Sequence, residues 1–144
     1  MRCMIALLFT LSLAGCEGHN EVISPGPVSL PLRADLHPDQ SIRIPQLGLT
    51  ATFNGVTSDS RCPAGAECVW QGDGATRLSI IRDPGPAVTC TLHTLLSPHV
   101  IEVGAVVFQL RELQPYPQMG SIINTAAYVA VLEVDLADAP YARR

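Results

Sequence analysis

Lysine is absent from this chain of 144 residues, so all nine basic residues are arginines. Charged residues make up only 15% of the chain and aromatic residues 5%. Without the expected leader, which holds Arg2, 8 arginines face 13 acidic residues, a balance of 8 − 13 = −5. The arginines are scattered, and nucleic acids and anionic membranes attract clustered basic residues. We therefore expect no nucleic-acid partner. Nor does the apolar run at residues 4–13 reach the ~20 residues that a membrane-spanning helix needs.

The first sixteen residues resemble the signal and lipobox of bacterial lipoproteins. The apolar run at residues 4–13 has the length of a signal-peptide core, roughly 7 to 15 residues. It ends in Leu13-Ala14-Gly15-Cys16, which is similar to a lipobox. The resemblance implies that residues 1–15 are removed and that Cys16 becomes the lipidated first residue. The alternative is an ordinary cleaved signal with Cys16 in a disulfide.

A lipid on Cys16 predicts a protein held on the periplasmic side of the bacterial cell envelope, in either the inner or the outer membrane. Two or three acyl chains attach a protein stably, whereas one does so only marginally. We expect residues 16–27 to form the lipidated cysteine and a tether, because this segment is polar, rich in proline and glycine, and without a helix or strand period. A folded domain over residues 28–137 and a tail over residues 138–144 complete the predicted organisation.

From residue 28 onward, apolar residues recur at alternate positions, the pattern of half-buried strands. Twelve prolines and eleven glycines are spread along the chain, and turn signals separate the alternating segments. We predict an all-β domain: an antiparallel two-sheet β-sandwich of about seven strands, with an immunoglobulin-like topology as one arrangement. Residues 119–127 give the least clear pattern. The alternating apolar sets are Val28-Leu30-Leu32, Ile42-Ile44, Leu49-Ala51-Phe53, Leu78-Ile80, Val88-Cys90-Leu92, Val106-Phe108-Leu110 and Tyr128-Ala130-Leu132-Val134-Leu136.

Three cysteines remain in the exported part, where thiols become oxidised. Cys62 and Cys68 bracket a short loop, so we predict a disulfide between them, for which chain entropy gives ~2 to 2.5 kcal/mol. Cys90 is then a small, inward-facing hydrophobe. The alternative joins Cys90 to one of the other two across the sheets. A zinc site with His93 is disfavoured because His93 points away from Cys90, so we expect no metal and no cofactor.

The segment D-S-R-C-P-A-G-A-E-C-V-W-Q-G-D-G-A, residues 59–75, resembles a signature of small uncharacterised bacterial lipoproteins. Residues 110–117 and 128–134 resemble later strands of the same family. The resemblance implies a fold and a location in the envelope. It implies no activity.

The same segment contains the candidate binding residues Asp59, Arg61 and Trp70. Asp59 and Arg61, two positions apart, can meet by side chain or cap turn backbone groups. Trp70 can cover the small loop while its indole N–H finds a carbonyl. One interpretation is a stapled loop that closes one end of the sandwich. The other is an exposed recognition loop anchored by Arg61 and Trp70, since these residue types dominate binding hot spots.

Catalytic patterns are missing from the sequence, so we expect no catalytic residues. The G-x-S-x-G elbow of serine hydrolases does not occur, and Pro98 between Ser97 and His99 indicates a turn rather than a dyad. The acidic residues have no calcium-loop spacing and are expected to be mostly solvated turn residues: Asp59, Glu67, Asp73 and Asp83.

We predict a non-catalytic binding or structural module for an envelope protein or glycan. The alternatives are a chagasin-like protease inhibitor, although its loop motifs are absent, and a small hydrolase.

Overall fold

The computed structural model describes residues 29–137. The predicted signal peptide (1–15), the lipidated Cys16 with its tether (16–27) and the C-terminal tail (138–144) lie outside the described residues. No helix within the described part of the chain has the length and apolar character needed to cross a membrane.

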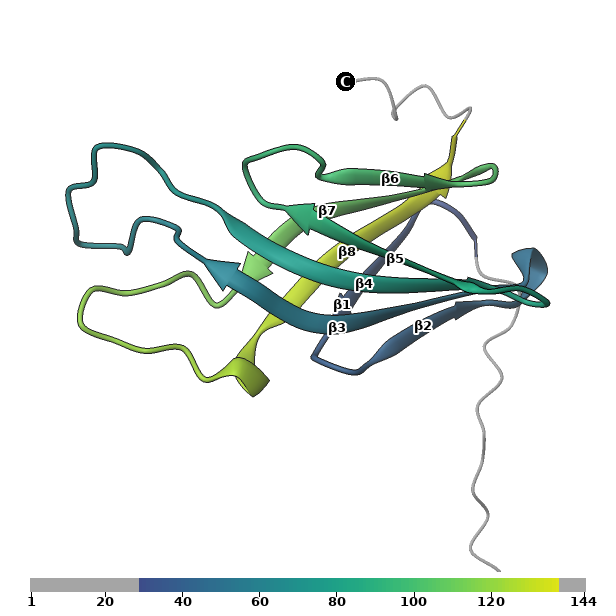
Figure 1. Ribbon diagram of the computed structural model, residues 1–144, viewed down its shortest axis with the longest axis horizontal. Coiled ribbons are helices and arrows are strands. Elements are labelled where there is room, and N and C mark those ends of the chain that lie inside the picture. Colours follow the sequence, from purple (N-terminus) through teal and green to yellow (C-terminus); the bar gives the residue numbers. More distant parts are fainter. Residues whose placement is uncertain (1–28, 138–144) are drawn as a thin grey trace, which may run out of the picture.

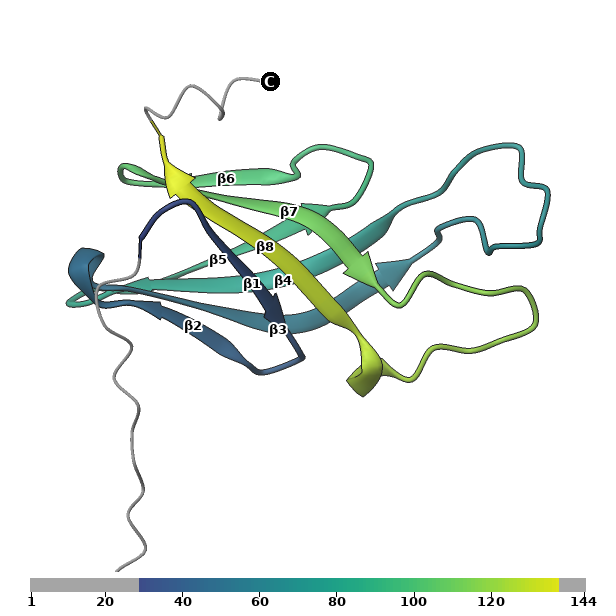
Figure 2. The same ribbon diagram turned by 180° about the vertical axis from the view of Figure 1, so that it is seen from behind.

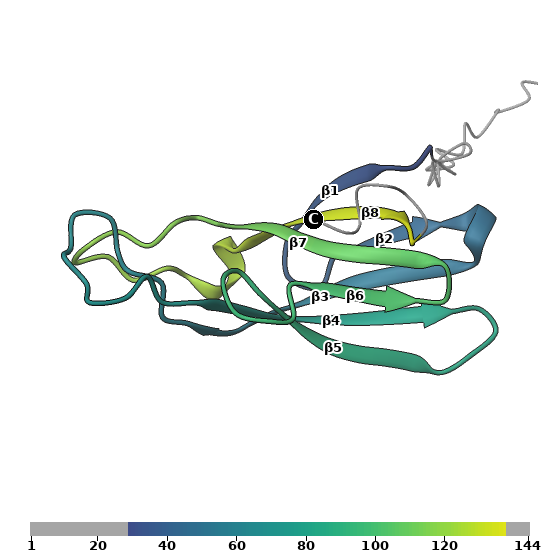
Figure 3. The same ribbon diagram turned by 90° about the horizontal axis from the view of Figure 1, so that it is seen from above.

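Eight strands form two antiparallel sheets of four strands each, which confirms the predicted all-β sandwich. Figures 1 and 2 show the sandwich from opposite sides, and Figure 3 shows it from above. Two short 3-10 helices, η1 (Pro45–Leu47) and η2 (Thr125–Ala127), lie in connections. The strands are β1 (Leu32–Leu36), β2 (Ser41–Ile44), β3 (Leu49–Asp59), β4 (Gly74–Arg82), β5 (Ala87–His93), β6 (Val100–Val103), β7 (Val106–Gln114) and β8 (Val129–Leu136).

The strand count of seven was one too low, because β6 escapes the alternation pattern. It has only four residues, Val100–Val103, and three of them are apolar, so no period of two stands out. The predicted first strand also lies later than expected: β1 begins at Leu32, so Leu30 precedes the strand. The indistinct segment 119–127 is a connection that ends in η2.

The strand order is β1-β8-β7-β6 in one sheet and β2-β3-β4-β5 in the other. Neighbours in the sheets are thus mostly neighbours in the chain, and β1 lies beside β8. In an immunoglobulin domain, by contrast, the first, second, fifth and fourth strands share one sheet. The immunoglobulin-like topology is therefore not the one observed.

The core lies between the two sheets and is formed largely by the alternating residues that the sequence predicted. Val107 and Val131, expected on the outer face, are also buried, and Leu136, expected inward, is exposed. Phe53 of β3 and Phe108 of β7 are fully buried, one in each of two adjoining clusters. The same clusters contain other buried residues of the central strands, among them Leu49, Ala51 and Leu78. Burial of their apolar surface stabilises the fold by about 25 cal/mol per Å². At the β5 edge the pattern weakens: Val88 faces inward but is exposed.

Candidate functional site

Three connections lie at one end of the sandwich, which we call the loop end. They are residues 60–73 between β3 and β4, residues 94–99 between β5 and β6, and residues 115–124 between β7 and η2. In Figures 1 and 2 the first and third project side by side, at the end opposite η1. Ala64 joins them through its backbone: its N–H donates to Pro117 O at 2.8 Å, and its carbonyl accepts from the N–H of Met119 at 3.1 Å.

A disulfide between Cys62 and Cys68 closes the 60–73 loop, as the sequence predicted. Cys62 is half-buried, and its N–H donates across the loop to Gln71 O at 2.7 Å, whereas Cys68 is exposed. Cys90 is the free cysteine of the described residues and lies half-buried on β5. Burial raises the pKa of the Cys90 thiol above its ordinary value.

Arg61 lies at the centre of a buried polar network. Its Nε and Nη2 atoms donate to the two carboxylate oxygens of Asp59 at 2.8 and 2.6 Å. Its Nη1 donates to Leu113 O, and its Nη2 also donates to Pro115 O at 2.9 Å. The guanidinium carbon lies 5.3 Å from the ring centre of Tyr116. A single side chain on the β3 side of the sandwich therefore holds the end of β7 and the start of the 115–124 loop.

The interpretation of Asp59 and Arg61 as exposed binding residues is wrong. Arg61 is only 8% exposed, and the Asp59 side chain is 10% exposed. The two side chains do meet, which is one of the two roles that their spacing predicted. Burial raises the pKa of Asp59, but the hydrogen bonds and charge of Arg61 and the hydroxyl of Tyr128 outweigh it, so this pKa lies below its ordinary value.

Asp73, the last residue of the 60–73 loop, holds the 94–99 loop in place by side-chain hydrogen bonds. Its Oδ1 accepts the backbone N–H groups of Leu95 and Leu96 at 2.9 and 3.2 Å. Its Oδ2 lies 2.6 Å from Nδ1 of His93. Burial raises the pKa of Asp73, but the hydrogen bonds from His93 and from these backbone groups outweigh it and lower the pKa overall.

An aspartate thus lies at each end of the 60–73 loop: Asp73 positions the 94–99 loop directly, and Asp59 positions the 115–124 loop through Arg61. The sequence reasoning missed Asp73, which it treated as a solvated turn residue. Its position just before β4 was the available signal, but its partners lie 20 or more residues further along the chain. Glu67 and Asp83 are exposed, as predicted for turn residues.

The two ends of the 60–73 loop, which we call its stems, approach each other closely where Gly72 meets Ser60. Gly72 has a positive φ of 71°. A Cβ atom at this position would lie 1.8 Å from the carbonyl oxygen of Ser60. Only glycine fits such an approach. The base of the 60–73 loop is therefore fixed by backbone contact, and the disulfide closes the loop beyond that contact.

The loop end carries most of the exposed large apolar side chains of the described residues. Seven of ten lie on its three loops, and Val69 and Ile122 are completely exposed. Trp70 is 56% exposed, so more than half of this residue's surface is open to solvent. We call these seven side chains the apolar patch: Val69, Trp70, Leu95, Leu96, Tyr116, Met119 and Ile122.

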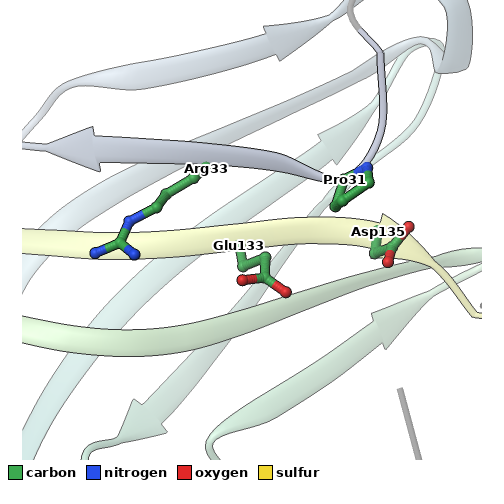
Figure 4. A pocket seen from close by; sticks show the side chains of 4 residues that line it. All are labelled: Pro31, Arg33, Glu133 and Asp135. Atoms are coloured by element: carbon green, nitrogen blue, oxygen red, sulfur yellow. The ribbon is translucent and has the colours of Figure 1, made fainter. Parts of the chain in front are cut away.

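A hollow of about 210 Å³ lies within the loop end. Leu95 and Tyr116 line it together with Gln71 and Arg111, so it connects all three loops. Another hollow, of about 270 Å³, lies on the outer face of β1 and β8 and is lined by Pro31, Arg33, Glu133 and Asp135. Figure 4 shows the three charged side chains of that hollow spread along two strands. It shares no lining residue with the loop end.

Three or more His, Cys, Asp and Glu side chains placed to hold a metal ion occur nowhere in residues 29–137. The disulfide also removes Cys62 and Cys68 from any set of free thiolate ligands. Comparisons with protein families, curated proteins and solved structures found no match for this chain.

Proposed function

We propose that this chain is a non-catalytic binding module of the bacterial envelope, anchored by lipid on Cys16, that binds a protein through the apolar patch. The observation that carries the proposal is the placement of seven exposed apolar side chains on three loops that are tied to one another. Exposed apolar side chains that gather in one region of a soluble protein often mark a site of protein interaction. Rigid loops also lower the entropy that binding must offset.

The composition of the loop end favours a protein as the partner. Protein interfaces are enriched in Trp, Tyr and Met and depleted of charge at their centre. Trp70, Tyr116 and Met119 all belong to the patch. Within residues 62–72, 94–98 and 115–124, Glu67 is the one charged residue.

Membranes and glycans fit the same surface less well. A loop that binds an anionic bilayer surface carries arginine or lysine beside its apolar tip, and these segments carry neither. Sugars are bound by flat aromatic faces with nearby hydrogen-bonding groups, whereas the two completely exposed side chains, Val69 and Ile122, are branched aliphatics. Such side chains fit apolar pockets on another protein.

The direction of the chain supports the same role. β1 begins at Leu32, which is paired with Val134 near the end of β8, and both lie at the end of the sandwich away from the loops. A lipid on Cys16, upstream of β1, would therefore attach the domain by the end that does not bind. The patch would face away from the membrane that holds it.

A matched pair of double variants tests the proposal. The full-length chain, tagged and solubilised in mild detergent, is mixed with envelope extract, crosslinked and recovered. We expect Val69→Ser with Ile122→Ser to lose the crosslinked protein. Ile81→Ser with Val88→Ser should retain it, because these side chains, 41% and 44% exposed, lie outside the loop end. Equal recovery with both variants would contradict the binding surface.

One observation favours protease inhibition as a second candidate, in which the bound protein is a protease. The disulfide-closed 60–73 loop and the 115–124 loop form a projection that is tied at its base, and Glu67 is the one charged residue within 62–72 and 115–124. A rigid projection of this kind can enter an active-site cleft without being cut. Inhibition assays against serine and cysteine proteases, repeated with the Val69→Ser and Ile122→Ser double variant, distinguish this candidate from other protein partners.

A further inference from the structure

The disulfide supports two features on which the apolar patch depends. One is the position of Val69 and Trp70, and the other is the contact between the 60–73 and 115–124 loops. Val69 and Trp70 directly follow Cys68. Ala64, which makes both backbone hydrogen bonds to the 115–124 loop, lies inside the ring that Cys62 and Cys68 close. Opening that ring therefore loosens both loops together.

The two sulfur atoms differ in their surroundings. Cys62 follows the buried Arg61, and its backbone is bonded to Gln71 O at 2.7 Å, so it belongs to the fixed stem of the loop. Cys68 and both of its neighbours, Glu67 and Val69, are exposed. An attacking thiolate must approach along the S–S axis, so the accessible sulfur is the one attacked.

We propose that the Cys62–Cys68 disulfide is a thiol–disulfide exchange site that controls binding at the apolar patch, with Cys68 Sγ as the atom attacked. This inference rests on the proposed protein binding. The co-reactant is a protein dithiol of the envelope. Its thiolate attacks Cys68 Sγ, the S–S bond breaks and Cys62 leaves as a thiolate that takes up a proton. The second thiol of the dithiol then displaces Cys68, so that the dithiol is oxidised to a disulfide and both cysteines end as thiols.

The sandwich itself does not depend on this bond. Both cysteines lie between β3 and β4, outside the two sheets and outside both core clusters. The stem below the ring keeps Arg61 with Asp59, and Ser60 N–H bonded to Asp73 O at 2.8 Å. Reduction should therefore free the tip of the 60–73 loop and leave the domain folded.

Trp70 provides a readout of the loop that does not require a partner, because it is the one tryptophan of the chain and lies two residues from Cys68. The experiment uses the full-length chain with Cys90→Ala, so that no third free thiol of the domain takes part. After treatment with dithiothreitol we expect lower Trp70 fluorescence anisotropy with unchanged circular dichroism. Equal anisotropy in the oxidised and reduced chains would overturn the inference, whatever the partner does.

Retention of the crosslinked partner is the second measurement. Reduction should lower affinity by roughly tenfold, the cost of ordering one or two freed side chains on binding. The Cys62→Ser with Cys68→Ser variant should match the reduced chain without any reductant. Equal retention in both redox states would refute control by the disulfide while leaving the binding proposal intact. If neither state retains a partner, the binding proposal fails and this inference fails with it.

Trapping identifies the sulfur that is attacked. An envelope dithiol protein that lacks its second cysteine stops at the mixed disulfide, and peptide mapping then locates the bond. We expect the bond on Cys68. A mixed disulfide on Cys62 would overturn the assignment.

Discussion

The hydroxyl of Tyr128 donates a hydrogen bond to Oδ2 of Asp59 at 3.0 Å, although 69 positions separate the two residues in the chain. Tyr128 leads into β8 of one sheet, and Asp59 ends β3 of the other. Asp59 in turn holds Arg61, which binds the carbonyls of Leu113 and Pro115. This network therefore joins both sheets and two of the three loops behind the apolar patch.

Replacement of Asp59 by asparagine should be strongly destabilising. Arg61 would then be buried without its carboxylate partner, a change that typically costs about 3–5 kcal/mol. Tyr128→Phe serves as the control, because it removes one hydrogen bond to the same carboxylate and should cost only about 1.5–3 kcal/mol. Urea unfolding of both variants measures the difference. A loss below about 1 kcal/mol for Asp59→Asn would contradict a structural role for the ion pair.

Acid should destabilise the domain through Asp59 and Asp73. Both have a folded-state pKa below the ordinary value of about 3.9, so between these values the unfolded chain binds more protons than the folded one. Their contribution is complete above about pH 5 and is lost as the pH falls through the lowered pKa values. Chemical unfolding at a series of pH values from neutral to below 3 should show this decline. The decline in the free energy of unfolding should be shallower in Asp73→Asn, and this variant should be less stable than the natural chain at neutral pH.

Gly72 and Gly120 form a matched pair for testing the base of the loop end. Both have a positive φ, 71° and 75°, so alanine is strained at either position, by roughly 1–2 kcal/mol. At Gly72 the new Cβ also meets Ser60 O, whereas at Gly120 nothing lies within 4 Å. Thermal unfolding should therefore show a much larger loss for Gly72→Ala. Similar melting temperatures for the two variants would mean that the stems do not approach as described.

The location in the envelope depends on Cys16, which lies outside the described residues. Cys16→Ser should move the protein from the membrane fraction to the soluble fraction, because a serine at the predicted lipidation position has no thiol to form the thioether that carries the lipid. Mass spectrometry of the natural N-terminal peptide should show a diacylated or triacylated cysteine. An unmodified Cys16 would remove the membrane from the proposed function without affecting the apolar patch.

The sequence predicted the architecture better than the loop end, for a physical reason. The alternation of apolar and polar residues along a strand indicates which side of the strand is buried. Most inward residues of β3, β7 and β8 were therefore identified from their spacing alone. The alternation does not record which strands are neighbours, so the strand order could not be predicted. The loop end depends on contacts such as Arg61 with Leu113, 52 residues apart, for which no local pattern exists. A buried arginine also contradicts the general preference of charged residues for the surface.

The pairing of β1 with β8 brings the first and last strands of the domain together at the edge of one sheet. A linker could connect them, and the chain could be reopened in the tight turn between Val103 and Val106, at the same end. Such a circular permutant would preserve every strand neighbour. The tips of the three loops would then form the free end of a display scaffold, and their exposed residues could be varied while Arg61, Gly72 and Asp73 keep the points of attachment.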